Sequence, residues 1–272
     1  MDSKTVEGFG DEWSRFTQDG LTEADLRECF DSYFRIFPWA DLPSDAVGFD
    51  AGCGSGRWAA VVAPRVGTLH CVDASDRALE VARKNLAHRS NCRFHECSVA
   101  ELPFEDGSMD FGYSLGVLHH VPDTRGAIRA CVSKLKRGAP FLVYLYYAFD
   151  NRPEWYRRLW QLSEFGRATV SSLPMPLRYG TSQVIAASVY LPLARFAKWM
   201  ENVGVDVQSF PLTAYRDRSF YVMRTDALDR FGTRLEQRFT AAEITSMLED
   251  AGLENIRFSD AVPYWCAVGT KA

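Results

Sequence analysis

Four residues between positions 50 and 56 have types and a spacing that could hold a ligand. Asp50 follows a short apolar run, and Gly52, Gly54 and Gly56 come after it at alternate positions. Glycine permits the positive φ angles of a tight turn and lets the backbone approach a ligand closely. Open α/β sheets bind ligands at the carboxyl ends of their strands, where such a turn would lie. The segment therefore predicts a buried strand that ends in a ligand-binding loop.

The same spacing argues against two phosphate-binding loops. A dinucleotide fingerprint counted from Gly52 needs its third glycine at position 57, and the chain has Arg57 there. A P-loop needs a Gly-Lys-Ser/Thr triplet, which does not follow. The Asp-x-Gly-x-Gly-x-Gly loop instead resembles that of the class I, Rossmann-like methyltransferases, whose cofactor S-adenosylmethionine (SAM) carries no phosphate.

A second stretch, residues 96–123, extends this resemblance. Its SVAELPF at 98–104 takes the place of a segment found in small-molecule methyltransferases of the ubiquinone- and menaquinone-biosynthesis type, and His119-His120 closes the motif. The segment FGDEWSRF at 9–16 resembles the start of bacterial methyltransferases of sugar and natural-product pathways. Both segments favour a small-molecule methyltransferase.

The resemblance implies SAM as methyl donor, S-adenosyl-L-homocysteine as product, and roles for individual residues. Asp73, which follows Asp50 by 23 residues, would accept hydrogen bonds from the ribose hydroxyls, and Asp50 would anchor the methionyl amino group. Ser98 stands where the family has an acidic residue that holds the adenine amino group. The other cofactor-binding candidates are Gly52, Cys53, Gly54, Gly56, Ala74, Val99, Leu115 and Trp13. Two alternatives stay open: Asp73 could cap the next helix, and Asp50 could stabilise the glycine turn.

His119 and His120 are the candidates for catalysis. Histidine can take a proton near neutral pH, so either ring could deprotonate or orient an acceptor hydroxyl. The family pair occurs in enzymes that methylate oxygen, nitrogen or carbon, and a structural role is the alternative. Since the sulfonium is already an activated leaving group, alignment alone could supply much of the rate, without any catalytic residue.

Residues 151–238 differ in composition from the rest and are predicted to be a helical insertion over the carboxyl edge of the sheet. They hold 13 Arg and Lys against 8 Asp and Glu, and prolines at 174, 176, 192 and 211 are expected to break the helices. The insertion would build the substrate pocket, although a helical subdomain, a dimer contact or a solvated arginine face would have the same pattern. The substrate-binding candidates are Tyr146, Tyr147, Tyr215, Arg216, Arg218 and Tyr221.

The elements that must position these residues alternate between strand and helix, which predicts a doubly wound, mostly parallel α/β sheet. The methyltransferase resemblance implies seven strands with the last one antiparallel. We expect an N-terminal helical lid at 1–40, a SAM-binding core at 41–150 and 239–272, and the insertion between them. Strands are expected at 68–73, 92–97, 109–115, 140–148 and within 254–270. Helices are expected from Thr22 to Pro38, at 57–63, from a Ser75 cap, from Pro122, and at 241–251 behind a capping box of Thr240 and Glu243.

The composition argues against several other classes of protein. A net charge of −4 and a pI near 5.8 over 272 residues disfavour a nucleic-acid partner. Seven cysteines without a CxxC pair predict free thiols and no metal site. No signal sequence and no membrane span are expected, so a cytoplasmic protein is predicted, and a homodimer is left open.

The predicted function is methyl transfer from SAM to an oxygen or nitrogen of a metabolite such as a natural product, a sugar or a lipid-like molecule. One alternative is a carbon methyltransferase acting on a lipophilic ring, with a membrane-associated substrate entering along residues 184–200. Others are a SAM-binding protein or enzyme that uses the sulfonium for different chemistry, and an NAD-dependent oxidoreductase.

Overall fold

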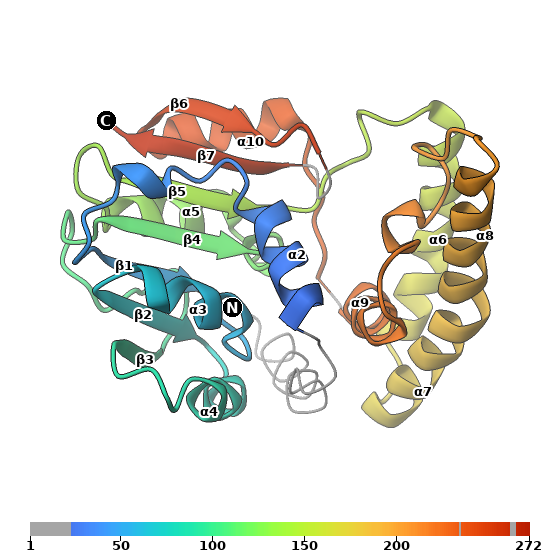
Figure 1. Cartoon of the computed structure of the whole chain (residues 1–272), viewed down its shortest axis with the longest axis horizontal. Coiled ribbons are helices and arrows are strands. Elements are labelled where there is room, and N and C mark those ends of the chain that lie inside the picture. The colour runs from blue at the N-terminus through green and yellow to red at the C-terminus, as the bar shows by residue number, and fades with distance from the viewer. Residues whose placement is uncertain (1–22, 234, 262–264) are drawn as a thin grey trace. The chain divides into compact units, whose positions relative to one another are not determined.

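The computed structural model describes residues 23–233, 235–261 and 265–272. The chain divides into two compact units (Figure 1). Within the described residues, the first unit comprises residues 26–148, 235–261 and 265–272, and the second comprises residues 23–25 and 149–233. Trp13, the FGDEWSRF segment and most of the predicted lid lie outside the described residues.

The first unit is built on one sheet of seven strands in the order β3-β2-β1-β4-β5-β7-β6 (Figure 1). All neighbouring strands are parallel except that β7 runs antiparallel to both β5 and β6. This confirms the predicted fold class. The strands are β1 (Val47–Ala51), β2 (Thr68–Asp73), β3 (Cys92–Glu96), β4 (Phe111–Leu115), β5 (Pro140–Tyr144), β6 (Leu253–Phe258) and β7 (Cys266–Lys271).

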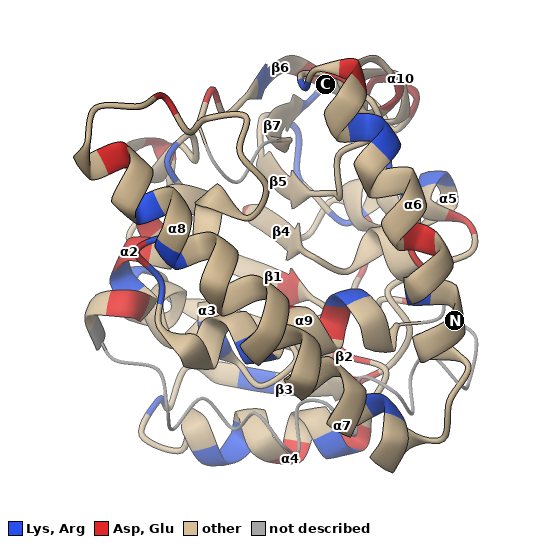
Figure 2. Cartoon of the chain, turned by 90° about the vertical axis from the view of Figure 1, so that its right-hand side faces the viewer, with Lys and Arg blue, Asp and Glu red and all other residues tan. Residues whose placement is uncertain are grey.

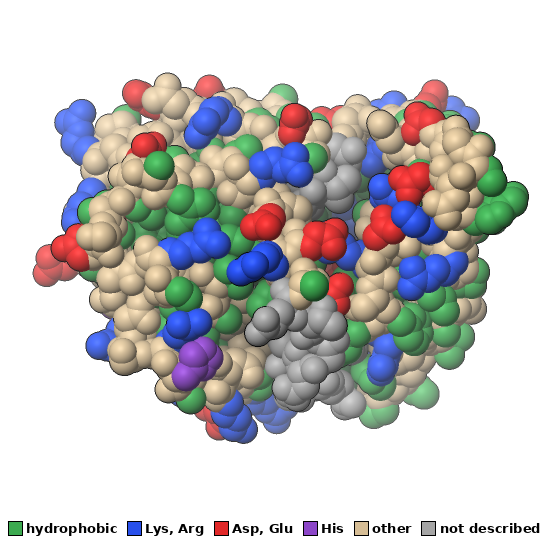
Figure 3. Space-filling model, viewed as in Figure 1, with side chains coloured by type: hydrophobic (Ala, Val, Ile, Leu, Met, Phe, Trp, Pro, Cys, Tyr) green, Lys and Arg blue, Asp and Glu red, His purple; other side chains and the backbone are tan. Residues whose placement is uncertain are grey.

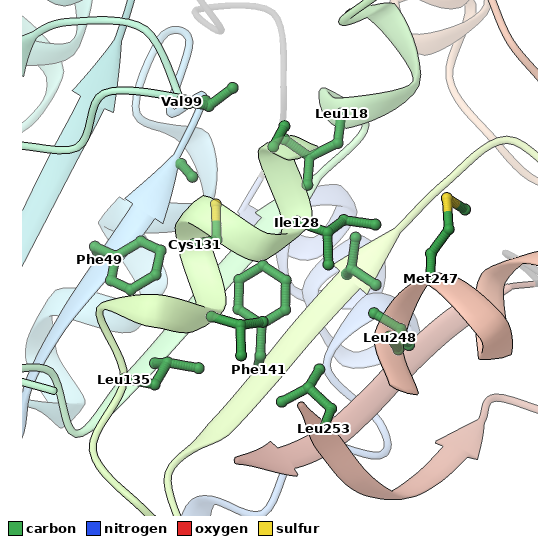
Figure 4. Packing of buried hydrophobic residues seen from close by; sticks show 14 of the residues in the cluster. Phe49, Val99, Leu118, Ile128, Cys131, Leu135, Phe141, Met247, Leu248 and Leu253 are labelled. Atoms are coloured by element: carbon green, nitrogen blue, oxygen red, sulfur yellow. The ribbon is translucent and has the colours of Figure 1, made fainter. Parts of the chain in front are cut away.

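Helices cover both faces of this sheet, because its central strands are apolar on both sides. One cluster packs α5 and α10 against the sheet through Ile128, Leu248 and Phe141 (Figure 4). The other packs α2, α3 and α4 through residues that include Phe30 and Trp58. The helices are α2 (Glu23–Tyr33), α3 (Arg57–Val62), α4 (Asp76–Asn85), α5 (Thr124–Ser133) and α10 (Ala241–Asp250), with 3-10 helices η1 (Trp39–Asp41), η2 (Ala63–Arg65) and η3 (Leu118–His120).

The helix caps largely follow the sequence. Ser75 caps α4 by accepting the Ala78 N–H, and Thr240 and Glu243 form the predicted capping box of α10. The prediction that Pro122 begins a helix is wrong. Asp123 accepts the Gly126 N–H at 2.8 Å and acts as the N-cap, so α5 starts at Thr124. The structure also ends α2 at Tyr33 and β5 at Tyr144, before their predicted ends.

The second unit is helical. It contains α6 (Glu154–Ser171), α7 (Met175–Ile185), η4 (Ala186–Tyr190), α8 (Leu191–Asn202), η5 (Thr213–Tyr215) and α9 (Phe220–Gly232). Its own small core includes Ala186, Tyr190, Ala194, Met223 and Ala227.

The predicted break at Pro192 is wrong, because the helix continues through it. The segment Ala186–Tyr190 is a π-helix that joins α7 directly to α8. Pro192 directly follows this π-helical segment and lacks the N–H that would bond to the preceding turn, so the wider π-helical turn coincides with the interruption of the helical hydrogen bonds. Pro174 does separate two helices, and it is the N-cap residue of α7.

Candidate functional site

The glycine loop connects β1 to α3 at the carboxyl edge of the sheet. Gly52, Gly54 and Gly56 all have positive φ, at 83°, 53° and 79°. A Cβ on Gly52 would lie 2.5 Å from the side chain of Val117. Both this close contact and the positive φ exclude larger residues at position 52. The predicted turn is therefore present, and the neighbouring β4–η3 connection packs tightly against it.

Asp73, at the end of β2, organises this loop. Its Oδ2 accepts the Gly54 N–H at 2.9 Å, and its Oδ1 accepts the Ser75 N–H at 2.9 Å. Burial raises the pKa of Asp73, and the two backbone N–H groups oppose that rise. Each carboxylate oxygen has a second lone pair, so both can still accept hydrogen bonds from a ligand. Ser75 caps α4, which leaves the helix-capping alternative for Asp73 without support.

Asp50, in β1, is almost completely buried, with 1% of its surface exposed. Within the described part of the chain no cationic side chain and no backbone N–H bonds to its carboxylate oxygens, and the Tyr113 hydroxyl lies beside them. Burial raises its pKa to about 8; the nearby Tyr113 hydroxyl lowers it and the charge of Asp73 raises it. A cationic group beside Asp50 would restore its ionised form. The methionyl ammonium and sulfonium of SAM are cations, so this donor set fits that cofactor.

The predicted adenine-binding residues follow β3. The Ser98 hydroxyl accepts the Ala100 N–H at 3.3 Å, while Val99 is buried in the core. Leu115 ends β4, Ala74 follows β2, and Cys53 is buried in the glycine loop. These positions line the carboxyl edge from β3 to β4, and their part in cofactor binding stays a prediction.

His119 and His120 lie in η3, directly after β4, and neither is exposed to solvent. The Nδ1 of His120 is 2.6 Å from the Leu235 carbonyl oxygen, which fixes Nδ1 as the protonated nitrogen and Nε2 as the acceptor. Burial lowers the pKa of His119 well below its ordinary value, with the neighbouring His120 and Arg238 adding to the shift. His119 is therefore neutral at physiological pH.

Aromatic rings surround this histidine pair. The ring of His119 stacks on Tyr146, with centroids 3.8 Å apart, and Tyr144 is 5.7 Å from Tyr146. Tyr33 of α2 meets Tyr144 edge-on at 5.1 Å. The arrangement forms an aromatic cluster next to the cofactor-binding edge.

Residues 236–239, which no sequence motif marks, also contact this aromatic cluster. Phe239 pairs with Tyr147, and the Gln237 N–H donates to the His119 carbonyl at 3.0 Å. The Arg238 guanidinium lies 5.1 Å above the Tyr146 ring and pairs with Glu236 at 2.7 Å. Glu236, Gln237 and Arg238 fall within the predicted insertion 151–238, and Phe239 begins the second part of the predicted core.

The remaining substrate-binding candidates lie in the second unit. Arg216 forms ion pairs with Glu201 at 3.0 Å and Asp217 at 3.5 Å, and the ring of Tyr215 contacts that of Tyr190 at 5.3 Å. Arg218 and Tyr221 belong to the same unit. Tyr146 and Tyr147 belong to the first unit, so the structure divides the predicted substrate residues between the two.

The described residues contain no group of three or more His, Cys, Asp or Glu side chains able to hold a metal ion. All seven cysteines are free thiols, as predicted.

The sheet order, with acidic residues near the end of β1 and at the end of β2, is that of a class I, Rossmann-like methyltransferase fold. Residues 49–143, about a third of the chain, match the family model of the methyltransferase domain. An uncharacterised methyltransferase of Bacillus subtilis, YcgJ, is 34% identical over 104 residues, which are 38% of this chain and 41% of that protein. The ubiquinone biosynthesis O-methyltransferase of Xanthomonas axonopodis is 28% identical over 68% of this chain and 74% of its own length.

A solved structure supports the fold. An O-methyltransferase family protein from Burkholderia thailandensis superposes with a TM-score of 0.55 at 16% identity, covering 100% of this chain and 61% of that one. At this identity the similarity concerns the fold alone. This chain matches less than half of the Bacillus relative, and the matched family region ends before the helical unit.

Proposed function

We propose that this protein transfers a methyl group from SAM to a hydroxyl oxygen or an amino nitrogen of a small metabolite. The observation that carries the proposal is the buried Asp50 carboxyl group, which bonds to no cationic side chain and no backbone N–H in the described structure and lies close enough to Asp73 for their charges to interact. Two acids at one sheet edge suit a cofactor with both a cationic end and a ribose. When bound, SAM supplies an activated methyl group. Asp50 would hold its ammonium, and Asp73 its ribose hydroxyls.

The aromatic cluster supports a planar acceptor. Tyr144 and Tyr146, at and just after the end of β5, are partly exposed beside the two buried histidines, and an aromatic or unsaturated ring could pack against them. The named activity of the Xanthomonas relative, O-methylation in ubiquinone biosynthesis, agrees with an oxygen acceptor of this kind. For methyl transfer the protein needs to align the acceptor atom with the methyl group of SAM and to exclude water. It needs to remove at most one proton from the acceptor.

His120 is the better candidate for the base. His119 is a weak base, because its pKa is strongly lowered. In His120 the hydrogen bond to Leu235 keeps the lone pair on Nε2. That nitrogen could accept the acceptor's hydroxyl proton as the methyl group is transferred.

The test combines labelled SAM, a panel of phenolic and amino metabolites, and two variants of His120. His120→Asn keeps a side-chain N–H for the Leu235 carbonyl and removes Nε2, whereas His120→Ala removes both. We expect His120→Asn to keep wild-type thermal stability and SAM affinity but to lose about a hundredfold or more in kcat, as is typical for a general base. Equal kcat in wild type and His120→Asn would restrict His120 to a structural role. Absence of label transfer to every acceptor, despite SAM binding, would favour non-methyl chemistry of the sulfonium.

A further inference from the structure

Large exposed hydrophobic side chains are concentrated in the second unit. All twelve that are exposed among the described residues lie between positions 155 and 220. Monomeric proteins rarely gather exposed apolar side chains in this way, and such patches mark interaction surfaces. In Figure 3 hydrophobic side chains (green) gather along the edge that α7 and α8 occupy in Figure 1.

Five of these side chains form a row along the α7–α8 helix. They are Val184, Val189, Phe196, Trp199 and Val203, here called the outer stripe, and Val184 and Trp199 are 65% and 59% exposed. From Val189 onward their spacing of seven, three and four residues keeps them on one side of an α-helix. The rings of Phe196 and Trp199 stack with centroids 5.6 Å apart.

The π-helical segment extends this row across the junction of the two helices. Hydrogen bonds between residues five apart make a wider turn, so Val189 follows Val184 on the same side. The inward side carries Ala186, Tyr190 and Ala194, which are buried in the unit's own core. The helix is therefore apolar on two sides, and its own unit covers only one of them.

Charge indicates what would cover the other side. From Phe165 to Val203 the sequence has four basic residues and one acidic residue, Glu201, which pairs with Lys198 at 3.2 Å. Across residues 149–234 there are 12 Arg and Lys and 8 Asp and Glu, a balance of +4 in a chain whose net charge is −4. The ribbons of α7 and α8 are mostly uncharged in Figure 2. An exposed arginine, Arg195, stands next to Phe196 and bonds only to the backbone carbonyls of Arg216 and Arg218 among the described residues, so its charge is not neutralised there.

We propose that the outer stripe docks on the surface of an anionic lipid bilayer, with the α7–α8 helix lying in the plane of the interface. Aromatic and branched apolar side chains on one side, with basic residues nearby, suit the boundary between headgroups and acyl chains. No described helix is long and apolar enough to cross a membrane, and surface docking requires none. A row one side chain wide offers little of the roughly 800 Å² per partner that a stable protein interface buries, which favours lipid over a second copy. The proposal does not depend on methyl transfer.

The test is co-sedimentation of the full chain with vesicles of phosphatidylcholine alone or with 30 mol% phosphatidylglycerol. We expect binding to the anionic vesicles that weakens as NaCl is raised, because salt screens the basic residues. Phe196→Ser/Trp199→Ser should lower the partition coefficient at least about tenfold, since two large side chains no longer leave water. Trp155→Ser is the matched control: Trp155 is 52% exposed but lies in α6, outside the stripe.

Three results would overturn the proposal. Equal vesicle binding by the stripe variant and the wild type would show that the stripe does not contact the lipid. Equal loss in Trp155→Ser and in the stripe variant would show a general apolar effect. Absence of vesicle binding, together with a dimer by light scattering that the stripe variant abolishes, would assign the stripe to a second copy of the chain. Circular dichroism and thermal unfolding establish that each variant is folded before the binding is compared.

Discussion

At the scale of single residues, the burial of Asp50 is the strongest indication of a cofactor site. The fold buries this carboxyl group beside the Tyr113 hydroxyl and away from any bonded cation among the described residues, and its pKa rises from the ordinary 3.8 to about 8. A structural acid would gain nothing from such a place, since burial of a charge is unfavourable unless it is paired. A binding residue can remain there because its ligand supplies the opposite charge.

Asp50 should make the stability of the cofactor-free protein depend on pH. The folded state keeps the proton up to about pH 8, whereas the unfolded chain releases it near 3.8. The contribution of Asp50 to the free energy of unfolding should therefore fall as pH rises through this window, by at most about 1.4 kcal/mol per pH unit. Asp50→Asn cannot ionise, so its stability advantage over wild type should grow from pH 5 to 8 and then level off. Urea unfolding at each pH measures this, with the exposed Asp41→Asn as the control variant. Parallel curves for wild type and Asp50→Asn would contradict the assignment.

The elements were largely predictable because their signals are local. Asp50, the glycines and Asp73 follow strands that are bounded by turn and cap residues, and the capping box of α10 can be recognised from Thr240 and Glu243 alone. Two features were not predictable. The π-helical segment before Pro192 packs in one core with residues of α9, and the hydrogen bonds of Gln237 to His119 and Val121 join residues more than 100 positions apart.

The glycine loop offers a test at this scale. Gly52→Ala combines a strained positive φ with a Cβ that would lie 2.5 Å from Val117, so we expect a loss of about 1–3 kcal/mol in stability and weaker SAM binding. Gly138→Ala is the matched control, because Gly138 has a φ of 80° but no atom within 4 Å of the added Cβ. Its loss should be smaller and should leave SAM affinity unchanged. Equal effects of the two substitutions would show that close packing at Gly52 does not matter.

At the scale of the whole molecule, composition separates the two units. Residues 149–234 have a balance of +4, and the remainder of the chain therefore carries −8. The Rossmann-like unit holds the candidate cofactor site, and the helical segment 149–234, with its positive balance, holds the exposed apolar row. The candidate cofactor site could be predicted from sequence motifs. The exposed apolar row could not, because no motif tells which side of a helix faces solvent and only the structure shows it. If the outer stripe docks on lipid, the acceptor is expected to be an apolar metabolite that partitions into membranes.

The central claim is that this sheet edge binds SAM through Asp50 and Asp73, and calorimetric titration with SAM and with NAD tests it most directly. We expect one SAM bound per chain and no binding of NAD. Asp73→Asn should weaken SAM binding at least about tenfold, because a hydrogen bond to a charged group contributes roughly 1.5–3 kcal/mol. Binding of NAD without binding of SAM, or unchanged SAM affinity in Asp73→Asn, would contradict the account.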